Sequence, residues 1–282
     1  MSSTAMKVLV VGSGGREHAI CRALKRDGCT VVVAPGNPGA AEHARCVNIA
    51  VDDVAGLVAL ARTEAVDLVV PGPEAALMAG LADALADVKI PCCGPSKLAA
   101  QLEGSKTFMR HVADVAGVPS PVFRVVRAKS ELKAALEAMP GLPVVKADGL
   151  AAGKGVILPD DRDGCYEAAA AFLDGSLGEA GRIVVLEERL TGVEASLFYA
   201  CDGRELVALP HARDHKRIFD EDEGPNTGGM GAMSPNPEID AEREREIRVS
   251  IVEPVVRELA LRGTPYVGFL YAGVMIRPDG SI

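Results

Sequence analysis

The sequence predicts an α/β protein: an N-terminal domain with a doubly wound parallel sheet, followed by a second domain of α+β type. Two observations predict the first domain. Short apolar strands alternate with helical stretches, and the strands end in turns rich in glycine or proline. A third observation marks the second domain, because a glycine-rich hairpin with two lysines interrupts that alternation at residues 142–158. We place the two domains at residues 1–103 and 104–282.

The composition excludes several classes of protein. The chain has 282 residues, 48% of them hydrophobic, and a formal net charge of −9. Because affinity for nucleic acid requires clustered Lys and Arg, this charge argues against a nucleic-acid surface. Seven cysteines lie scattered without a C-x-x-C pair, which predicts reduced thiols rather than disulfides or a zinc site. We find no signal peptide and no apolar run of about 18 residues, and we expect a cytoplasmic protein without membrane contacts.

The first strand, residues 7–11, leads into the turn GSGGREH and a helix over residues 19–25. Glycines allow a tight turn here, and the N-terminus of the following helix attracts anions. The spacing is not G-x-G-x-x-G, so the turn gives little support to a dinucleotide site or to an NAD(P)-dependent oxidoreductase. Two interpretations stay open: Arg16 contacts a monophosphate, or the segment is a structural turn with a surface arginine.

Further α/β units complete the first domain. We predict strands at residues 30–33 and 67–70 and helices at residues 54–63 and 75–86. The second of these strands ends in the rigid turn PGPE, at the strand end where ligands collect in such sheets. Glu74 in this turn either contributes to a binding site or simply stabilises the start of the next helix.

The second domain begins with a helix over residues 105–116, which Ser105 is suited to cap. A strand at 122–126 and a helix at 130–139 precede the hairpin VVKADGLAAGKGVIL. Its loop carries three glycines and Lys154, and Lys146 stands at its base. Glycines let the backbone approach a ligand and lysines neutralise phosphate oxygens, so the hairpin either binds a polyphosphate or is an ordinary mobile tip. It is not a Walker A loop, because three residues instead of four separate Gly149 from Gly153. In addition, Gly155 stands after Lys154 where that motif has Ser or Thr.

The remaining elements follow in order. We predict a helix at 163–173, strands at 182–186, 195–200 and 206–209, and a turn at Asp202-Gly203. From Pro210 the chain becomes polar and glycine-rich as far as residue 235, which predicts an irregular loop that is functional or solvated. A helix over 238–261 should be kinked or divided at Pro254. A buried strand at 266–276 and the turn Pro278-Asp279-Gly280 end the chain.

Taken together, these segments resemble the ATP-grasp ligases and, among them, the phosphoribosylamine–glycine ligases (glycinamide ribonucleotide synthetases). The resemblance covers essentially the whole chain, in the family's order. It rests on the following runs: KVLVVGSGGREHA, APGNPG, VVPGPEAAL, GPSKLAAQLEGSK, VVKADGLAAGKGV, LEERLTGVEAS, DHKR, GPNTGGMGAMSP and GFLYAGVMI. Each run alone is weak, but the ordered set is specific. It implies an ATP-grasp fold with a small lid subdomain at about residues 121–190.

The resemblance also implies roles for individual residues. In ATP binding, the resemblance implies that Lys106 and Lys146 hold the phosphates and that Glu194 contacts the ribose hydroxyls. The implied lid over the triphosphate includes Gly149, Gly153, Lys154 and Gly155. The implied hinge, whose backbone reads adenine, includes Glu187, Glu188 and Leu190. Those implied in binding phosphoribosylamine and the reacting groups are Gly14, Gly15, Arg16, Glu17, Glu74, Thr227, Gly228 and Gly229. Those implied in catalysis are Asp214, Lys216, Arg217 and Asn226.

The implied reaction joins glycine to 5-phosphoribosylamine through glycyl phosphate, with release of ADP and phosphate. In the family a strand beyond the last turn carries a Glu and an Asn that bind Mg²⁺ or Mn²⁺, and a C-terminal domain follows. We therefore expect a truncated chain with an incomplete ATP-grasp fold, no metal ligands of its own and impaired catalysis. Two alternatives stay open: a non-catalytic ATP-binding fragment, or another ATP-grasp carboxylate–amine ligase.

Overall fold

The computed structural model describes residues 5–151, 154–220 and 223–282, which form two compact units. The first unit extends to Gln101 and includes the short segments Cys201–Glu205 and Arg262–Phe269. The second unit contains Leu102–Ala200, Leu206–Leu261 and Leu270–Ile282. No helix in the described part of the chain is long and apolar enough to cross a membrane.

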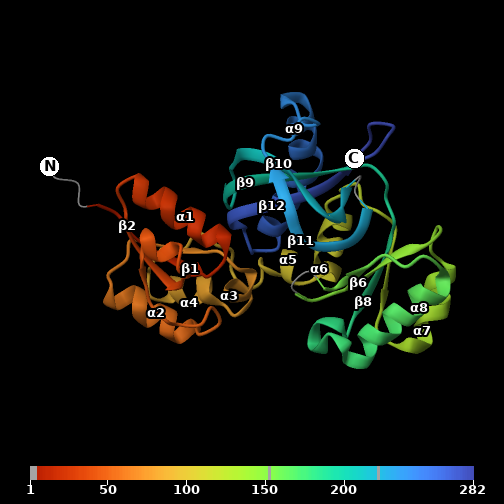
Figure 1. The fold of residues 1–282 in the computed structure, drawn as a ribbon, viewed down its shortest axis with the longest axis horizontal. Helices are drawn as coiled ribbons and strands as arrows, with labels where there is room; N and C mark the ends of the chain where they lie inside the picture. Colours follow the sequence, from red (N-terminus) through yellow and green to blue (C-terminus); the bar gives the residue numbers. More distant parts are fainter. Residues whose placement is uncertain (1–4, 152–153, 221–222) are drawn as a thin grey trace. The chain divides into compact units, whose positions relative to one another are not determined.

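A four-stranded parallel sheet in the order β3-β2-β1-β4 is the centre of the first unit. Figure 1 labels two of its strands, β1 and β2. Its strands are β1 (Lys7–Gly12), β2 (Thr30–Pro35), β3 (Arg45–Cys46) and β4 (Leu68–Pro71). Alternate residues of β1 face two separate apolar clusters, with Leu9 and Val11 in one and Val8 and Val10 in the other. Burial on both faces explains the continuous apolar runs. The predicted doubly wound sheet is therefore confirmed.

Helices cover both faces of this sheet. Cys21 of α1 packs into one cluster, while Leu57 of α2 and Leu85 of α4 pack into the other. The helices, with one 3₁₀ turn, are α1 (Gly15–Arg26), η1 (Ala40–Glu42), α2 (Val54–Thr63), α3 (Glu74–Met78) and α4 (Leu81–Asp87). The strand order reverses direction between β1 and β4, and the carboxyl ends of these strands are where such sheets bind ligands.

The prediction of one helix over residues 75–86 is wrong. The structure has two helices, with α3 ending at Met78 and α4 beginning at Leu81. Gly80 between them has φ of +96°, in the left-handed region that interrupts a right-handed helix. Leu81 and Leu85 remain fully buried, so the apolar periodicity continues across the break and conceals it in the sequence.

The first sheet of the second unit contains the lysine hairpin. Its strands, in the order β5-β8-β6-β7, are all antiparallel: β5 (Phe123–Val126), β6 (Pro143–Ala147), β7 (Val156–Ile157) and β8 (Val184–Glu188). Residues of α7 (Lys129–Glu137), α8 (Arg162–Ala171) and a π turn (Phe172–Ser176) share one apolar cluster with the sheet. A 3₁₀ turn (Gly178–Gly181) precedes β8. The predicted hairpin is confirmed by the pairing of β6 with β7.

The second sheet has the order β11-β10-β9-β12. Its strands are β9 (Val193–Asp202), β10 (Leu206–Phe219), β11 (Glu223–Met233) and β12 (Val267–Ile276). The helical elements outside the lysine-hairpin sheet are α5 (Gln101–Gly104), α6 (Lys106–Val115), α9 (Ala241–Ile247), η5 (Arg248–Val252) and α10 (Glu253–Leu261). The expected division of the helix near Pro254 is confirmed, because a π turn separates α9 from α10.

The prediction of an irregular loop over residues 210–235 is wrong. β10 continues to Phe219 and pairs antiparallel with β11, in the register Asp214↔Ala232. The register shifts twice, between His215 and Arg217 and between Arg217 and Phe219. Each bulge moves side chains to the other face of the ribbon, so the alternation of polar and apolar residues that marks a strand is lost in the sequence.

Candidate functional site

Two lysines of the second unit meet at the base of the glycine-rich hairpin. Lys146 lies near the end of β6, and Lys106 is the first residue of α6. The Lys106 ammonium donates to the backbone carbonyls of Asp148 (3.4 Å) and Gly149 (3.5 Å). The predicted cap on α6 is confirmed, since the Ser105 hydroxyl accepts from the Phe108 amide at 3.1 Å. A separate strand and helix thus bring both predicted phosphate-binding lysines to one place.

Beside these lysines lies a buried cluster of ions around Glu187 of β8. One carboxylate oxygen of Glu187 accepts from the Lys146 ammonium, and the other accepts from the Arg110 guanidinium, with Nε at 2.9 Å. The side chains of Arg110 and Glu187 are only 11% and 9% exposed. Burial by itself raises the pKa of Glu187, but Lys146 and Arg110 outweigh it and hold that pKa below its ordinary value.

Lys106 differs from these paired ions. Burial, the largest influence, lowers the pKa of Lys106, and the neighbouring Lys146 lowers it further, against the opposing effects of Asp148 and Glu187. Among the described residues no carboxylate lies within ion-pair distance of the Lys106 ammonium. A partly desolvated cation that contacts only carbonyl groups is suited to an anionic ligand with several oxygens, such as a polyphosphate.

The glycines of the hairpin have a packing role that is visible without a ligand. A Cβ on Gly149 would meet the Ala180 backbone at 2.9 Å, and a Cβ on Gly155 would meet the Ala151 Cβ at 2.8 Å. Lys154 is exposed, with its amide bonded to the Ala151 carbonyl at 2.9 Å. The predicted lid residue Gly153 lies outside the described residues. Close backbone approach therefore accounts for Gly149 and Gly155, whatever the lid binds.

The predicted hinge lies where β8 ends. The Glu188 carboxylate accepts from the Val122 amide at 3.1 Å, and the Glu188 amide donates to the Val122 carbonyl at 2.7 Å. Glu188 thus uses its side chain to hold the edge of the sheet. Leu190 is half-buried beyond the strand end. Glu188 is the last residue of β8 and Leu190 lies just beyond it, and their role as a hinge remains a prediction.

A second charged group lies on β9 and β10. The Lys216 ammonium contacts Glu194 at 3.3 Å and Asp214 at 3.2 Å. Although burial acts to lower it, the pKa of Lys216 is raised by Glu194, Asp214 and Tyr271. The Ser196 hydroxyl lies 3.4 Å from Asp214 and 3.3 Å from the Tyr271 hydroxyl. The predicted residues Glu194, Asp214 and Lys216 therefore form one cluster.

Other predicted residues lie on the β10–β11 hairpin. Arg217 donates to the Gly224 carbonyl, and the Thr227 hydroxyl donates to the Lys216 carbonyl at 2.9 Å. The Gly229 amide in turn donates to the Thr227 hydroxyl at 3.1 Å. Of the predicted set on this hairpin, two members have side-chain positions outside the description: Asn226 and Gly228. The contacts seen are within the hairpin and fix its irregular backbone.

The predicted residues of the first unit meet at the carboxyl ends of β1 and β4. Glu17, in the first turn of α1, is 5% exposed, and its carboxylate accepts from the Gly14 amide at 2.6 Å and from Arg16 at 2.8 Å. Arg16 also donates to Glu74 at 3.2 Å. Burial acts against the charge of Arg16, but the two carboxylates outweigh it and raise its pKa. Gly15, the first residue of α1, has no atom within 4 Å of the position of a Cβ.

Two residues that the sequence reasoning missed complete the lysine site. Arg110 lies four residues after Lys106 on α6, a spacing that places both on one helix face and was readable from the sequence. Asp148 follows β6 directly and holds the start of α6, because its carboxylate accepts from the Ser105 hydroxyl at 2.9 Å and the Thr107 amide at 2.6 Å. No local pattern signals the contacts of Asp148, which depend on the tertiary fold.

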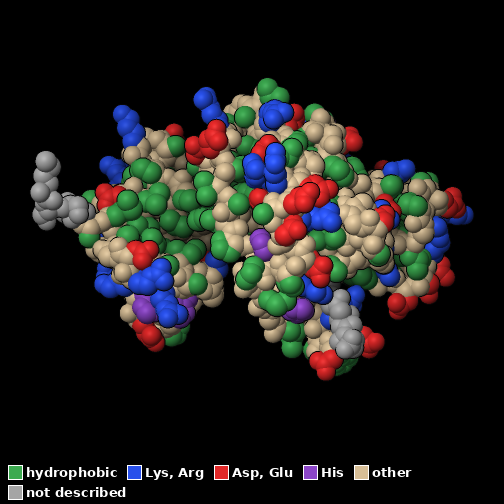
Figure 2. All heavy atoms as spheres, turned by 90° about the horizontal axis from the view of Figure 1, so that it is seen from above, with side chains coloured by type: hydrophobic (Ala, Val, Ile, Leu, Met, Phe, Trp, Pro, Cys, Tyr) green, Lys and Arg blue, Asp and Glu red, His purple; other side chains and the backbone are tan. Residues whose placement is uncertain are grey.

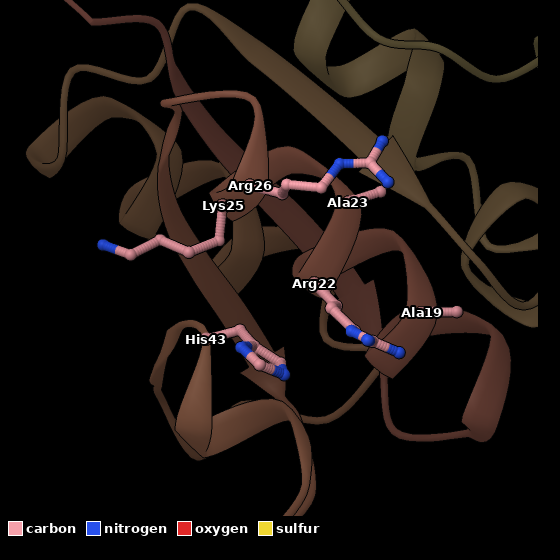
Figure 3. Close-up of a pocket in the computed structure, with 6 residues that line it drawn as sticks. All are labelled: Ala19, Arg22, Ala23, Lys25, Arg26 and His43. Carbon is pink, nitrogen blue, oxygen red and sulfur yellow. The ribbon is translucent and has the colours of Figure 1, made fainter.

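The described surface of the first unit has two hollows that neither Lys106 nor Lys146 lines, one of them beside Lys89, Cys92 and Thr264. The other, a shallow hollow, is lined by Ala19, Arg22, Ala23, Lys25, Arg26 and His43. Its charged side chains point in different directions and do not converge on one point (Figure 3). On the face drawn in Figure 2, basic and acidic side chains are interspersed over much of the surface. Within the described residues, no three His, Cys, Asp or Glu side chains are grouped to hold a metal ion.

Comparison with known proteins assigns both parts of the chain. The family model for the phosphoribosylglycinamide synthetase N domain matches residues 6–103, and the model for the ATP-grasp (A) domain of the same family matches residues 104–282. A curated phosphoribosylamine–glycine ligase from Allochromatium vinosum is 48% identical over 98% of this chain. The alignment spans 66% of that relative, so the chain corresponds to just under two thirds of its length.

Solved structures agree with these matches. The crystal structure of phosphoribosylamine–glycine ligase from Thermotoga maritima superposes with a TM-score of 0.83 and 30% identity, covering 97% of this chain and 66% of that one. The biotin carboxylase domain of a 2-oxoglutarate carboxylase from Hydrogenobacter thermophilus, solved with MgADP, has a TM-score of 0.75 at 16% identity. It covers 98% of this chain and 62% of that one and is similar in fold alone.

Proposed function

The chain belongs to the phosphoribosylglycinamide synthetase family and has its ATP-grasp fold, and on that premise we propose that it binds ATP in the second unit and serves the ligation of glycine to 5-phosphoribosylamine. The chain spans about two thirds of the length of its relatives.

The observation that carries the proposal is the partly buried Lys106 ammonium, which has no carboxylate partner among the described residues. This ammonium lies at the root of the glycine-rich hairpin. Lys146 and Arg110 lie nearby, where both contact Glu187. These three cations stand against the carboxylates of Glu187 and Asp148, which leaves an excess of one positive charge for nucleotide phosphates. The exposed Lys154 on the hairpin is available to the same phosphates when the lid closes.

The chemistry follows from this charge. A carboxylate oxygen of glycine attacks the γ-phosphorus of ATP, the bond to the β-phosphate oxygen breaks, and ADP leaves. The amine nitrogen of phosphoribosylamine then attacks the carbonyl carbon of glycyl phosphate, loses a proton and expels inorganic phosphate. Lys106 and Lys146 balance charge on the transferring phosphoryl group, and the hairpin excludes the water that would hydrolyse the acyl phosphate.

Other residues take supporting roles in the proposal. The turn formed by Gly14, Gly15, Arg16 and Glu17, with Glu74, binds phosphoribosylamine at the carboxyl ends of the parallel strands. Glu187, Glu188 and Leu190 form the hinge along adenine, and Glu194 binds the ribose. The reacting groups are held by residues on β10 and β11: Asp214, Lys216, Arg217, Asn226, Thr227, Gly228 and Gly229.

A divalent cation, Mg²⁺ or Mn²⁺, belongs to the proposed reaction as the companion of ATP. The described residues do not fit a metal centre of their own, since no three ligating side chains are grouped among them. The carboxylates of Glu194 and Asp214 are both paired with the Lys216 ammonium. The residues described here therefore act on the nucleotide by charge and position.

Substrate omission tests the proposal. ADP release is measured with this chain, ATP, Mg²⁺, glycine and freshly generated phosphoribosylamine, leaving out each substrate in turn. Release that requires both glycine and the amine supports the ligase. Equilibrium binding of ATP is measured in parallel, and a chain that neither binds ATP nor releases ADP contradicts the proposal. Lys106→Met should abolish both ATP binding and ADP release. Lys129→Met, which removes a surface ion pair in the same unit, should leave both unchanged.

A further inference from the structure

Asp148 contacts three consecutive residues at the start of α6. Its carboxylate accepts from the Ser105 hydroxyl (2.9 Å) and the Thr107 amide (2.6 Å), and its carbonyl accepts from the Lys106 amide (3.2 Å). Its own amide donates to the Ile183 carbonyl at 3.0 Å, just before β8 begins. One residue thus ties the first turn of α6 to the ends of two strands.

We propose that Asp148 is a positioning residue for nucleotide binding, because it fixes the ammonium of Lys106 at the root of the glycine-rich hairpin. The inference rests on the proposed function, since Lys106 matters only if it binds phosphate. Asp148 does not touch the nucleotide in this proposal. Its effect passes through the helix start and through its carbonyl, which accepts from the Lys106 ammonium at 3.4 Å.

The arrangement explains how a flexible side chain can act as a fixed charge. A lysine side chain has many rotamers, and holding it for a ligand costs entropy. Here the backbone of Lys106 is bonded to Asp148, and its ammonium contacts the carbonyls of Asp148 and Gly149. Gly149 is the first glycine of the hairpin, so movement of the hairpin root and placement of Lys106 are linked through these two carbonyls.

The carboxylate is also more than an ordinary helix cap. Ser105 already caps α6 by accepting from the Phe108 amide, and Asp148 adds an acceptor for the next free amide, that of Thr107. The chain offers a matched comparison in the same unit. Asp161 caps α8 by accepting from the Gly164 amide at 2.7 Å, and among the described residues it makes no hydrogen bond or ion pair with Lys106, Lys146 or Lys154.

The test compares Asp148→Ala, Asp148→Asn and Asp161→Ala in this chain by isothermal titration with ATP and Mg²⁺. Asp148→Ala should raise the dissociation constant for ATP about tenfold, the factor that corresponds to one lost hydrogen bond to a charged group. Asp148→Asn should restore most of the affinity, because the amide oxygen accepts from Thr107 and the amide nitrogen donates to Ser105. Asp161→Ala should lower thermal stability without changing ATP affinity.

Each other result has a defined meaning. Equal ATP affinity in Asp148→Ala and the unsubstituted chain overturns this inference and leaves the proposed function intact, as does an equal loss in Asp161→Ala. No ATP binding by the unsubstituted chain overturns both. If Asp148→Ala does not fold, Ser105→Gly replaces it: glycine is a tolerated cap, yet the hydroxyl that donates to Asp148 is gone. Affinity should then fall severalfold, and unchanged affinity overturns the inference.

Discussion

The turn around Arg16 and the cluster around Lys106 are both glycine-rich and basic in sequence, yet their charges are arranged differently. In the first unit, Arg16 is held by two carboxylates, those of Glu17 and Glu74. In the second, Lys146 and Arg110 share the carboxylate of Glu187, while Lys106 contacts only carbonyls within the described residues. The first group carries one cation and two anions, and the second carries an excess of cations.

The comparison separates two uses of glycine. Around Glu17, the nearby glycines make room for a carboxylate of the protein itself, since a Cβ on Gly72 would lie 1.9 Å from its Oε1. In the hairpin, Gly149 and Gly155 let the backbone fold closely on itself next to an available cation. The paired Arg16 therefore gives weaker support for a phosphate site than Lys106 does, and the proposed phosphoribosylamine site rests mainly on the family resemblance.

The largest expected effect comes from removing a cation of the second cluster. Lys146→Met should lower ligation or ATP turnover about 10²–10³-fold, because it deletes a positive charge that the proposed function assigns to the transferring phosphate. Steady-state ADP release measures the turnover, and titration with ATP measures the affinity of the same variant. Arg16→Met should leave ATP affinity unchanged. Equal losses in both variants would remove the distinction between the two regions.

The loss of unfolding free energy should be larger for the buried Arg110 than for the more exposed Arg16. Arg110→Met leaves Glu187 with one partner in an environment where the two side chains are 11% and 9% exposed, and should cost about 3–5 kcal/mol. Arg16→Met removes a side chain that is 54% exposed and should cost about 1 kcal/mol or less. Urea unfolding measures both, and a loss below about 1 kcal/mol for Arg110→Met would contradict the buried-cluster interpretation.

Acid should weaken the ionic contacts of Glu187 in the second unit, whereas neutral pH leaves them intact. Because the pKa of Glu187 is held below its ordinary value of 4.5, its ionic contacts stabilise the fold above that pH. The contribution is lost as the pH falls through the depressed pKa of the folded state. The protection factors of the β8 amides, which are corrected for the intrinsic pH dependence of exchange, should therefore fall as the pH drops below about 4.5.

A surface carboxylate of the first unit is the control for salt. Glu64, whose side chain is 21% exposed, also has a lowered pKa, chiefly through hydrogen bonds from Lys7 and Arg45. High salt should screen the ion pairs of Glu64, whose partners are 31% and 55% exposed, more strongly than those of Glu187. If 1 M salt, in which the screening length is about 3 Å, abolished the acid sensitivity of β8, its ion pairs would be solvated rather than buried.

The sequence was sufficient where local pattern and burial agree. The helix over residues 54–63 and the antiparallel hairpin at Lys146 follow from periodicity and turn chemistry, and the structure has both. Lys106, Lys146 and Glu187 were identified as site residues through family resemblance, and the fold brings their side chains together. Their roles toward ATP remain predictions.

What could not be predicted depends on contacts between distant residues. Arg110 meets Glu187 77 positions along the chain, and Asp148 meets Thr107 41 positions away. The four-residue spacing of Lys106 and Arg110 indicates a shared helix face but not the partner Glu187, and nothing in the sequence marks Asp148. The β10–β11 hairpin was missed for another reason, since two register shifts near Arg217 break the alternation on which strand prediction depends. Propensity describes a residue's neighbours in sequence, whereas these features are determined by neighbours in space.

The smallest effects should come from the glycines of the first unit. Gly72→Ala places a methyl group against the Glu17 carboxylate and should cost about 1–3 kcal/mol, since that buried side chain must move away from the Gly14 amide and Arg16. Gly15→Ala meets no atom within 4 Å at the start of α1 and should stabilise by about 0.4–1 kcal/mol. Thermal unfolding measures both. If Gly72→Ala were neutral, or Gly15→Ala as costly, the turn glycines would not be explained by the space Glu17 needs, and close approach of a ligand backbone or phosphate would become the better account of this turn.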